Sequence, residues 1–240
     1  MSMGGLPALP EPVLPTMRRS YGILVTGVGG TGVVTIGGLL GMAAHLENKG
    51  VTVLDMAGLA QKGGAVLSHV QIAAKPDDLH ATRIAMGEAD LVIGCDAIVS
   101  ATDEVISKTQ TGRTRAVVNT AQTPTAAFIK DPKWQFPGLS AEQDIRNAVG
   151  EACDFINASA LAVALLGDAI YTNPLVLGYA WQKGWIPLSL EALVRAIELN
   201  GVSVDKNKAA FDWGRHMRTT PITCCRSPAS SRRRRKARMW

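Results

Sequence analysis

Apolar and polar positions along the chain follow the order strand, helix, strand. An apolar run at 21–27 precedes apolar positions at helical spacing over 31–48, with Val34, Leu39, Met42 and Leu46 on or near one face. Further strands are predicted at 50–56, 64–73, 89–96, 115–120 and 153–158. The continuously apolar run at 89–96 is typical of a strand buried in a parallel sheet.

The segments between and after these strands predict helices. One is expected near 97–109, and another at 140–150, where Ser140 and Gln143 have the spacing of a capping box. The chain from 158 to about 214 reads as helical, with Gly201 ending one helix and Ser203 as the N-cap of the next. This alternation predicts an α/β fold: a three-layer α/β/α Rossmann-like sheet, mostly parallel, with a helical C-terminal part.

Composition divides the chain into three parts. Residues 1–19 contain four prolines and neither helical nor strand periodicity, which is typical of an extended linker and implies a preceding module. Residues 20–214 form the predicted globular domain. Residues 215–240 hold nine Lys/Arg residues and no acids, so we expect a disordered basic tail or an aberrant, out-of-frame terminus.

The tail also explains the net charge of +5. Without it the chain has 16 basic against 20 acidic residues, and only 12 of its 240 residues are aromatic. A nucleic-acid-binding module, whose basic tail would contact the phosphates, is therefore the weaker alternative, because the body offers neither a basic patch nor stacking platforms.

A glycine-rich turn joins the first strand to the first helix. Gly27, Gly29 and Gly32 spell G-x-G-x-x-G, and Gly30 and Thr31 complete the turn. Glycines permit positive φ and close approach of a ligand, while the N-terminus of the following helix favours a phosphate or carboxylate. The same glycines also suit tight strand–helix packing or a protein interface.

Asp55 closes the second strand, where a dinucleotide-binding fold places the carboxylate that binds the ribose. An NAD-dependent dehydrogenase using Gly27, Gly29, Gly32 and Asp55 is therefore one alternative. However, the next segment, 56–69, is broken by glycines where such a fold continues into a crossover helix. This segment instead makes Gln61, Lys62 and Gly63 candidate groups beside the glycine turn, with Lys62 able to hold a phosphate by charge.

We find no catalytic constellation in the sequence, and we expect no metal site. The four histidines have no acid or nucleophile partner in a recognisable motif, and the four cysteines lack metal-ligand or cluster spacing. No apolar run is long enough to span a bilayer, and prolines break any signal-peptide pattern at the N-terminus. We expect a cytoplasmic protein without membrane contact.

Longer stretches of the chain resemble a known family. "YGILVTGVGGTGVVTIGG", "MAGLAQKGGAVLSHVQIA", "RTRAVVNTAQTPTAAF" and "NKAAFDWGR" are similar to the γ module of 2-oxoacid:ferredoxin oxidoreductases, of the pyruvate/ketoisovalerate oxidoreductase catalytic-domain type. The resemblance is to the fused indolepyruvate ferredoxin oxidoreductases in particular. It extends from about residue 9 to residue 215 and stops where the basic tail begins, as expected of a fragment.

The resemblance implies oxidative decarboxylation of an arylpyruvate to acyl-CoA, with electrons passed to ferredoxin. It places thiamine diphosphate, Mg²⁺ and the iron–sulfur clusters on partner modules, so that the isolated chain is inactive. Its implication for this chain is a supporting role, in which Gly27, Gly29, Gly30, Thr31, Gly32, Gln61, Lys62 and Gly63 face coenzyme A or a partner module.

Overall fold

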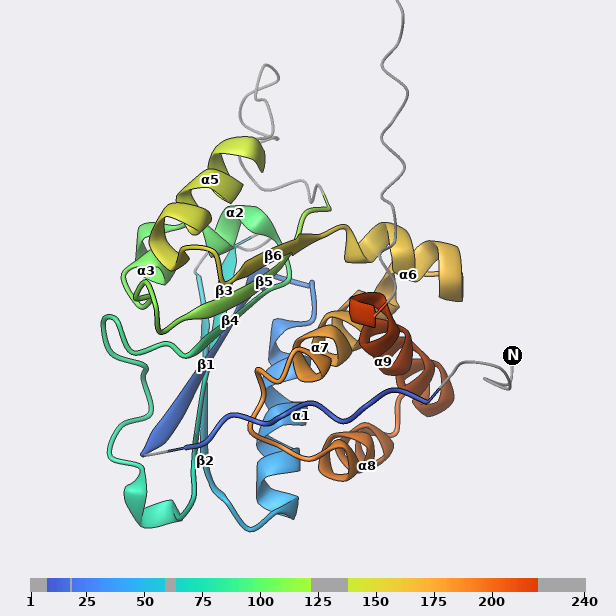
Figure 1. The fold of residues 1–240 in the computed structure, drawn as a ribbon, viewed down its shortest axis with the longest axis horizontal. Coiled ribbons are helices and arrows are strands. Elements are labelled where there is room, and N and C mark those ends of the chain that lie inside the picture. Colours follow the sequence, from blue (N-terminus) through green and yellow to red (C-terminus); the bar gives the residue numbers. More distant parts are fainter. Residues whose placement is uncertain (1–7, 18, 59–63, 122–137, 220–240) are drawn as a thin grey trace, which may run out of the picture.

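A computed structural model describes residues 8–17, 19–58, 64–121 and 138–219 (Figure 1). Its centre is a six-stranded sheet in the order β2-β3-β1-β4-β5-β6. The strands are β1 (Ser20–Val28), β2 (Gly50–Ala57), β3 (Ala65–Ala73), β4 (Leu91–Gly94), β5 (Arg115–Asn119) and β6 (Cys153–Ile156). β3 runs antiparallel to both of its neighbours, whereas the other three pairings are parallel. The predicted α/β class and the mostly parallel sheet are confirmed.

Helices cover both faces of this sheet (Figure 1). On one face lie α1 (Val33–Leu46), α7 (Thr172–Gln182), α8 (Leu190–Asn200) and α9 (Val204–Thr219), which share one buried apolar cluster with β1. On the other lie α2 (Ala97–Ser100), α3 (Asp103–Ile106) and α5 (Gly138–Val149), with a second cluster. The remaining described elements are the helix α6 (Ala158–Leu166) and two 3-10 turns, η1 (Pro76–Asp78) and η2 (Ala169–Tyr171).

The face that α1 buries differs from the predicted one. Ile36 and Leu40 are buried against the sheet, whereas Val34 is 52% exposed and Met42 is 40% exposed. Because α1 contains no charged residue and only two polar ones, its sequence offers no polar face that would mark the solvent side. Packing decides the orientation instead, since glycines on α1 allow its backbone to lie directly against β2 and β3.

Two predicted helices also differ from the observed ones. The helix predicted at 97–109 is two short helices, α2 and α3, separated at Ala101 and Thr102. α5 begins at Gly138, so Ser140 lies inside the helix and is not its N-cap. The Gln143 side chain donates forward to Asn147 at 2.8 Å, where a capping box would require it to reach back. By contrast, Gly201 ends α8 in a left-handed conformation as predicted.

The C-terminal helices pack with their backbones in direct contact. A Cβ on Gly178 of α7 would overlap the carbonyl oxygen of Phe211, and a Cβ on Gly214 of α9 would overlap that of Leu175. α9 continues to Thr219, so the boundary predicted after residue 214 falls inside this helix. Arg215 there packs over the ring of Trp181, with its guanidinium carbon 5.0 Å from the ring centroid.

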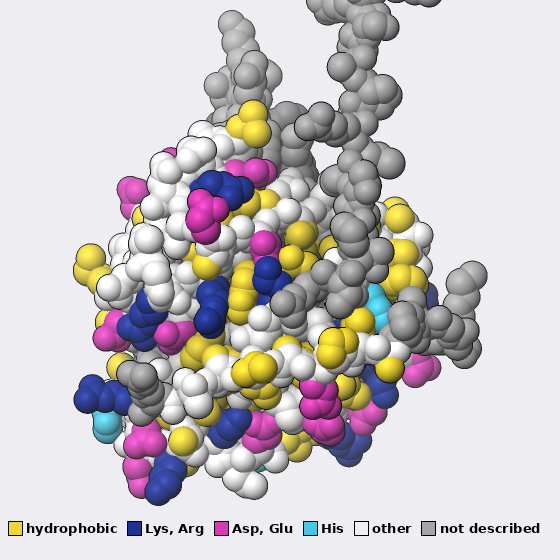
Figure 2. Space-filling view, in the orientation of Figure 1, with side chains coloured by type: hydrophobic (Ala, Val, Ile, Leu, Met, Phe, Trp, Pro, Cys, Tyr) yellow, Lys and Arg dark blue, Asp and Glu magenta, His cyan; other side chains and the backbone are white. Residues whose placement is uncertain are grey.

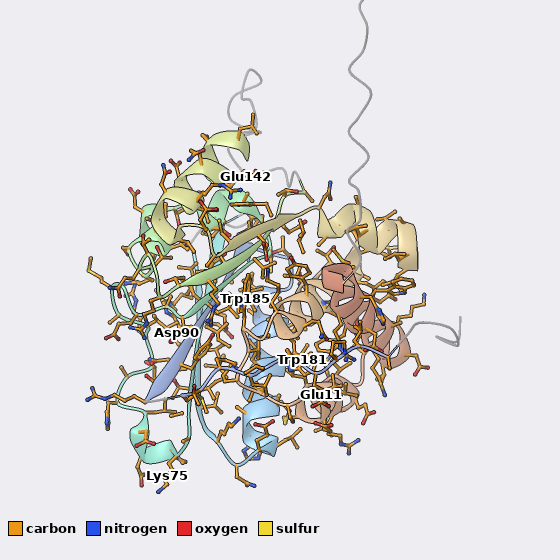
Figure 3. All side chains as sticks on the ribbon, viewed as in Figure 1. Glu11, Lys75, Asp90, Glu142, Trp181 and Trp185 are labelled. Atoms are coloured by element: carbon orange, nitrogen blue, oxygen red, sulfur yellow. The ribbon has the colours of Figure 1, made fainter. Side chains whose placement is uncertain are left out.

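The proline-rich segment 8–17 has no regular secondary structure and crosses the helical layer. The amide of Gln182 on α7 donates to the Pro10 carbonyl at 2.7 Å, and Met17 packs against the main core. Figure 3 labels Glu11 on this segment and Trp181 and Trp185 on the helical side that it crosses. Residues 8–17 are therefore attached to the domain, although their composition is that of a linker.

A buried histidine lies on β3, between the edge strand β2 and β1. His69 on β3 has no exposed surface, and its Nδ1 accepts a hydrogen bond from the backbone N–H of Ile84 at 3.2 Å. Its Nε2 is buried without a hydrogen-bond partner among the described residues. Burial lowers the pKa of His69 from 6.5 to about 4, with the charges of Arg83 and Lys108 acting in the same direction.

This histidine is expected to make the fold sensitive to acid. The unfolded chain binds the His69 proton below its ordinary pKa and the folded chain does not, so stability falls as the pH drops from about 7. The expected loss between pH 7 and pH 5 is about 2 kcal/mol. Urea unfolding across this range should show a shallower pH dependence for His69→Gln than for the wild-type chain. Equal slopes for the two proteins would contradict the assignment.

Candidate functional site at the glycine loop

The glycine loop joins β1 to α1 at the carboxyl edge of the sheet. A Cβ on Gly27 would lie 2.5 Å from Thr31 Oγ1 and 2.9 Å from the Cβ of Cys95, so no side chain fits there. Gly30 and Gly32 have φ of +91° and +85°, a conformation that L-residues rarely adopt. Space beside Gly30 is open, whereas a Cβ on Gly32 would strike the amide of Asn173.

Asp96 and Asn173 hold this loop in place. The Asp96 carboxylate accepts hydrogen bonds from Val28 N at 2.7 Å and from Val99 N at 2.9 Å. One side chain therefore both fixes the end of β1 and caps α2. The Asn173 amide donates to the Thr31 carbonyl at 2.5 Å and thereby ties the loop to the start of α7. Neither residue was identified from the sequence, although Asp96 is the last residue of the parallel strand predicted at 89–96, and site residues of α/β proteins gather at such strand ends.

Burial shapes the electrostatics around the loop. It raises the pKa of Asp96, against the opposing effect of the backbone N–H groups that bind the carboxylate. It also raises the pKa of the Cys95 thiol to about 12, so this cysteine is uncharged at neutral pH. The N-cap residue of α1 is Gly32, which has no side chain to cap the helix, so the first-turn N–H groups of α1 place a partial positive charge beside the loop.

The predicted loop residues Gln61, Lys62 and Gly63 lie outside the described residues. The residues on either side of that segment are described, and they adjoin the glycine loop. Gly29 N donates to the Gly64 carbonyl at 2.8 Å, and Gly58 N donates to the Ala65 carbonyl at 2.8 Å. Gly64, the first described residue after this segment, therefore lies beside the turn. The assignment of Gln61, Lys62 and Gly63 to the site stays a prediction.

Asp55 does not join the glycine loop. It lies exposed on the edge strand β2, and β3 separates that strand from β1. In register Asp55 is level with Ser68 and Val25, three residues before β1 ends. A dinucleotide-binding fold would place the strand bearing this carboxylate directly beside β1. The inserted antiparallel strand removes the geometry on which the NAD-dependent alternative depends.

A cavity of about 520 Å³ opens beside the loop. The start of α1 forms one side, and η2, the start of α7 and the α8–α9 connection form the other. At its floor Asn119 donates to the Cys95 carbonyl at 3.1 Å and to the Ser159 hydroxyl at 3.0 Å. The Thr172 hydroxyl lies 3.2 Å from that of Ser159 and donates to the Ala169 carbonyl at 2.6 Å. These polar side chains therefore satisfy one another.

The cavity residues could be found only in part from sequence. Asn119 follows the apolar residues of β5, so the rule that ligands bind at the carboxyl ends of parallel strands would have singled it out. Ser159 and Thr172 come from helices distant in sequence, and no local pattern marks them. The described ranges contain no group of three His, Cys, Asp or Glu residues that could hold a metal ion. They also contain no helix long and apolar enough to cross a membrane.

A glycine turn at the carboxyl edge of a helix-covered sheet, with a cavity beside it, places this chain among the α/β proteins, in which ligands commonly bind at that edge. The chain belongs to the family described as "Pyruvate ferredoxin/flavodoxin oxidoreductase", whose sequence model matches residues 22–217. That match covers the glycine loop, the cavity and nearly all of α9.

Similar proteins include two archaeal proteins named indolepyruvate oxidoreductase subunit IorB. The chain is 28% identical over 201 residues to the one from Pyrococcus horikoshii, covering 82% of this chain and 95% of the relative. It is 29% identical over 198 residues to the one from Archaeoglobus fulgidus, covering 80% and 92%.

Solved structures share the fold. The pyruvate oxidoreductase subunit PORC from Thermotoga maritima superposes with a TM-score of 0.59 at 19% identity, over 83% of this chain and 97% of that one. A 2-oxoglutarate:ferredoxin oxidoreductase from Magnetococcus marinus, solved with 2-oxoglutarate, coenzyme A and succinyl-CoA bound, gives a TM-score of 0.62 at 15% identity. There the match covers 85% of this chain and 32% of the larger one.

Proposed function

We propose that this chain is the IorB-type subunit of an indolepyruvate, or related 2-oxoacid, ferredoxin oxidoreductase in the cytoplasm. The observation that carries the proposal is coverage: the similarity to proteins named IorB extends over 92–96% of their length. The subunit supports oxidative decarboxylation of an arylpyruvate to acyl-CoA, with electrons passed to ferredoxin. Thiamine diphosphate, Mg²⁺ and iron–sulfur clusters belong to companion subunits and supply the carbon and electron chemistry.

Within that enzyme we assign the glycine loop to coenzyme A or to a companion subunit. Gly29 and Gly30 are exposed, and the uncapped N-terminus of α1 lies directly behind them. Backbone N–H groups in this arrangement favour a phosphate or carboxylate. Lys62 would add a full positive charge, since its segment is attached to the loop through the bond from Gly29 to Gly64.

This assignment is tested by titrating coenzyme A into the assembled enzyme while acyl-CoA formation is measured. Lys62→Ala is expected to raise the coenzyme A concentration at half-maximal rate by about tenfold, the cost of one charge-assisted phosphate contact. Lys75→Ala is the matched control, because Lys75 is exposed at the opposite end of β1, near η1. Unchanged coenzyme A dependence in Lys62→Ala would remove that residue from the site.

Assembly itself separates this proposal from the dehydrogenase alternative. Co-expressed with the companion subunit from the same organism, the full chain is expected to co-purify with it in equal amounts. Calorimetric titration of the isolated full chain with NAD⁺ is expected to release no heat of binding. Tight NAD⁺ binding together with failure to co-purify would favour the dehydrogenase.

A further inference from the structure

The strand β2 leaves one edge of the sheet open. It is the first strand in the sheet order, and within the described ranges no strand pairs with its free side. The turn η1 packs only against its start, where a Cβ on Gly50 would lie 2.7 Å from Pro76 Cα. Beyond Gly50 the strand carries one charged side chain, Asp55, and neither lysine nor proline, the residues that usually protect such edges. The edge is therefore suited to pair with another strand.

The hydrogen bonds between β2 and β3 show which backbone groups point outward. Gly58 N donates to the Ala65 carbonyl, which continues the antiparallel register of these two strands. Along such a ladder, hydrogen-bonded pairs alternate with pairs that make no bond to each other. The even-numbered residues of β2 therefore bond to β3. The odd-numbered residues direct their N–H and C=O groups to the free edge: Val51, Val53, Asp55 and Ala57.

The helix α1 presents an uncharged side toward the same edge. A Cβ on its Gly41 would lie 2.9 Å from a methyl carbon of Val53, so this side of the helix faces β2. Val34, Gly38 and His45 share that side at helical spacing, and all three are exposed. α1 contains no Lys, Arg, Asp or Glu, whereas charged side chains of both signs are spread over the face of the molecule seen in Figure 2. An uncharged helix side therefore adjoins the open strand edge.

Strand spacing and helix packing agree on what fits this edge. α1 packs on both β2 and β3, so its axis lies about half a strand spacing inside β2 (Figure 1). When a second copy adds its own β2 antiparallel to this one, the two-fold axis is perpendicular to the sheet, and both α1 helices lie on the same face. Their axes are then two strand spacings apart, about 9.6 Å. Helices pack at roughly 8–10 Å, so an antiparallel copy extends the sheet and closes the helical layer together.

We infer that two copies of this chain form a symmetric dimer, in which their β2 strands pair antiparallel about a two-fold axis at Val53. Both Gly37 and Gly41, near the middle of α1, face Val53: a Cβ on either would lie 3.5 Å or 2.9 Å from one of its methyl carbons. The axis therefore passes the middle of the helix as well as that of the strand. Each copy offers the same surface to the other, as a two-fold interface requires.

The charges at this edge favour the same register. Asp55 lies opposite the partner's Val51, and the two Asp55 residues are about 14 Å apart along the strands, beyond the roughly 10 Å over which exposed charges interact at 0.1 M salt. An axis at Asp55 would instead set the two carboxylates directly opposite each other, which is destabilising. His45 lies one helical turn beyond Gly41, level with Val51 and hence with the partner's Asp55. Each end of the interface therefore gains a polar pair.

The oligomeric state of the full chain tests the inference. Light scattering over a dilution series is expected to show a reversible dimer of the wild-type chain. Asp55→Pro removes an outward N–H and leaves the hydrogen bonds from β2 to β3 in place. Each dimer then loses two backbone hydrogen bonds, so its dissociation constant is expected to rise at least about thirtyfold. Asp55→Thr keeps the N–H on a β-branched residue and is the matched control, expected to remain dimeric.

Cross-linking tests the register, and it does not require the proline variant to fold. In a background with Cys224 and Cys225 replaced by serine, the remaining two cysteines are buried. Val53→Cys then places two thiols on directly opposed residues, whose Cα atoms are about 5.5 Å apart. Val51→Cys places them about 14 Å apart. A bis-maleimide too short for the longer span is expected to give a covalent dimer with Val53→Cys and none with Val51→Cys.

Three results would overturn the inference: a wild-type chain that stays monomeric, an Asp55→Pro dimer as tight as the wild-type one, or equal cross-linking at the two cysteine positions. A monomeric chain whose Asp55→Pro variant no longer co-purifies with the companion subunit would assign the β2 edge to that subunit instead. Acyl-CoA formation by the assembled enzyme is a separate readout, so loss of the dimer leaves the proposed function untouched.

Discussion

Replacing Gly178 by alanine is expected to destabilise the fold by about 3 kcal/mol, near the upper end of the cost of overpacking a core. The added methyl group would overlap the Phe211 carbonyl oxygen and lie 2.8 Å from its carbon and 3.1 Å from the Phe211 Cα. These are backbone atoms of α9, which cannot rotate away as a side chain would. Helix α7 or α9 must therefore shift, despite the roughly 1 kcal/mol that alanine contributes to helix formation.

The matched control is Gly38→Ala on α1, where a Cβ meets nothing within 4 Å among the described atoms. This change is expected to stabilise the protein by about 0.5–1 kcal/mol through helix propensity alone. Urea unfolding of both variants gives the comparison. A Gly178→Ala variant as stable as Gly38→Ala would contradict the direct backbone contact between α7 and α9.

Removing the Asp96 carboxylate is the second change with a large expected effect. Asp96→Ala leaves the buried N–H of Val28 without its acceptor and deletes the cap of α2, and together these losses amount to about 3 kcal/mol. The glycine loop begins at Val28, so its geometry should also loosen. The expected result is a lower midpoint of urea unfolding and faster amide hydrogen exchange over residues 28–32.

Two further variants separate the contributions of this carboxylate. Asp96→Asn keeps one of the two acceptor oxygens and is expected to cost less than Asp96→Ala. Asp168→Ala removes an exposed cap, which accepts from Ile170 N at 2.9 Å, and should cost about 1 kcal/mol or less. An Asp96→Ala variant no less stable than Asp168→Ala would contradict the anchoring role given to Asp96.

The strands could be predicted from the sequence because their signal is local. Each apolar run between turn residues became a strand, and the carboxyl edge of the sheet follows from the order of strands and helices. β3 was predicted as a strand, but its insertion between β1 and β2 depends on long-range pairing that no local pattern encodes. That one insertion separates Asp55 from the glycine loop.

The site could be predicted only where backbone conformation dictates the residue type. Gly30 and Gly32 mark positive φ directly, so the loop was visible in the sequence. Asn173 lies in a helical segment 142 residues from Thr31, and its role arises only when α7 packs beside the loop. Similarly, α1 is apolar on all sides, so its buried face is chosen by its neighbours and could not be identified from spacing.

The most direct test of the central claim, that this chain acts as a subunit of a larger oxidoreductase, is a reconstitution assay. Reduction of ferredoxin by indole-3-pyruvate and coenzyme A is measured with the companion subunit alone, with this chain alone, and with both. We expect turnover only when both are present. Turnover by this chain alone, or full turnover by the companion subunit without it, would contradict the claim.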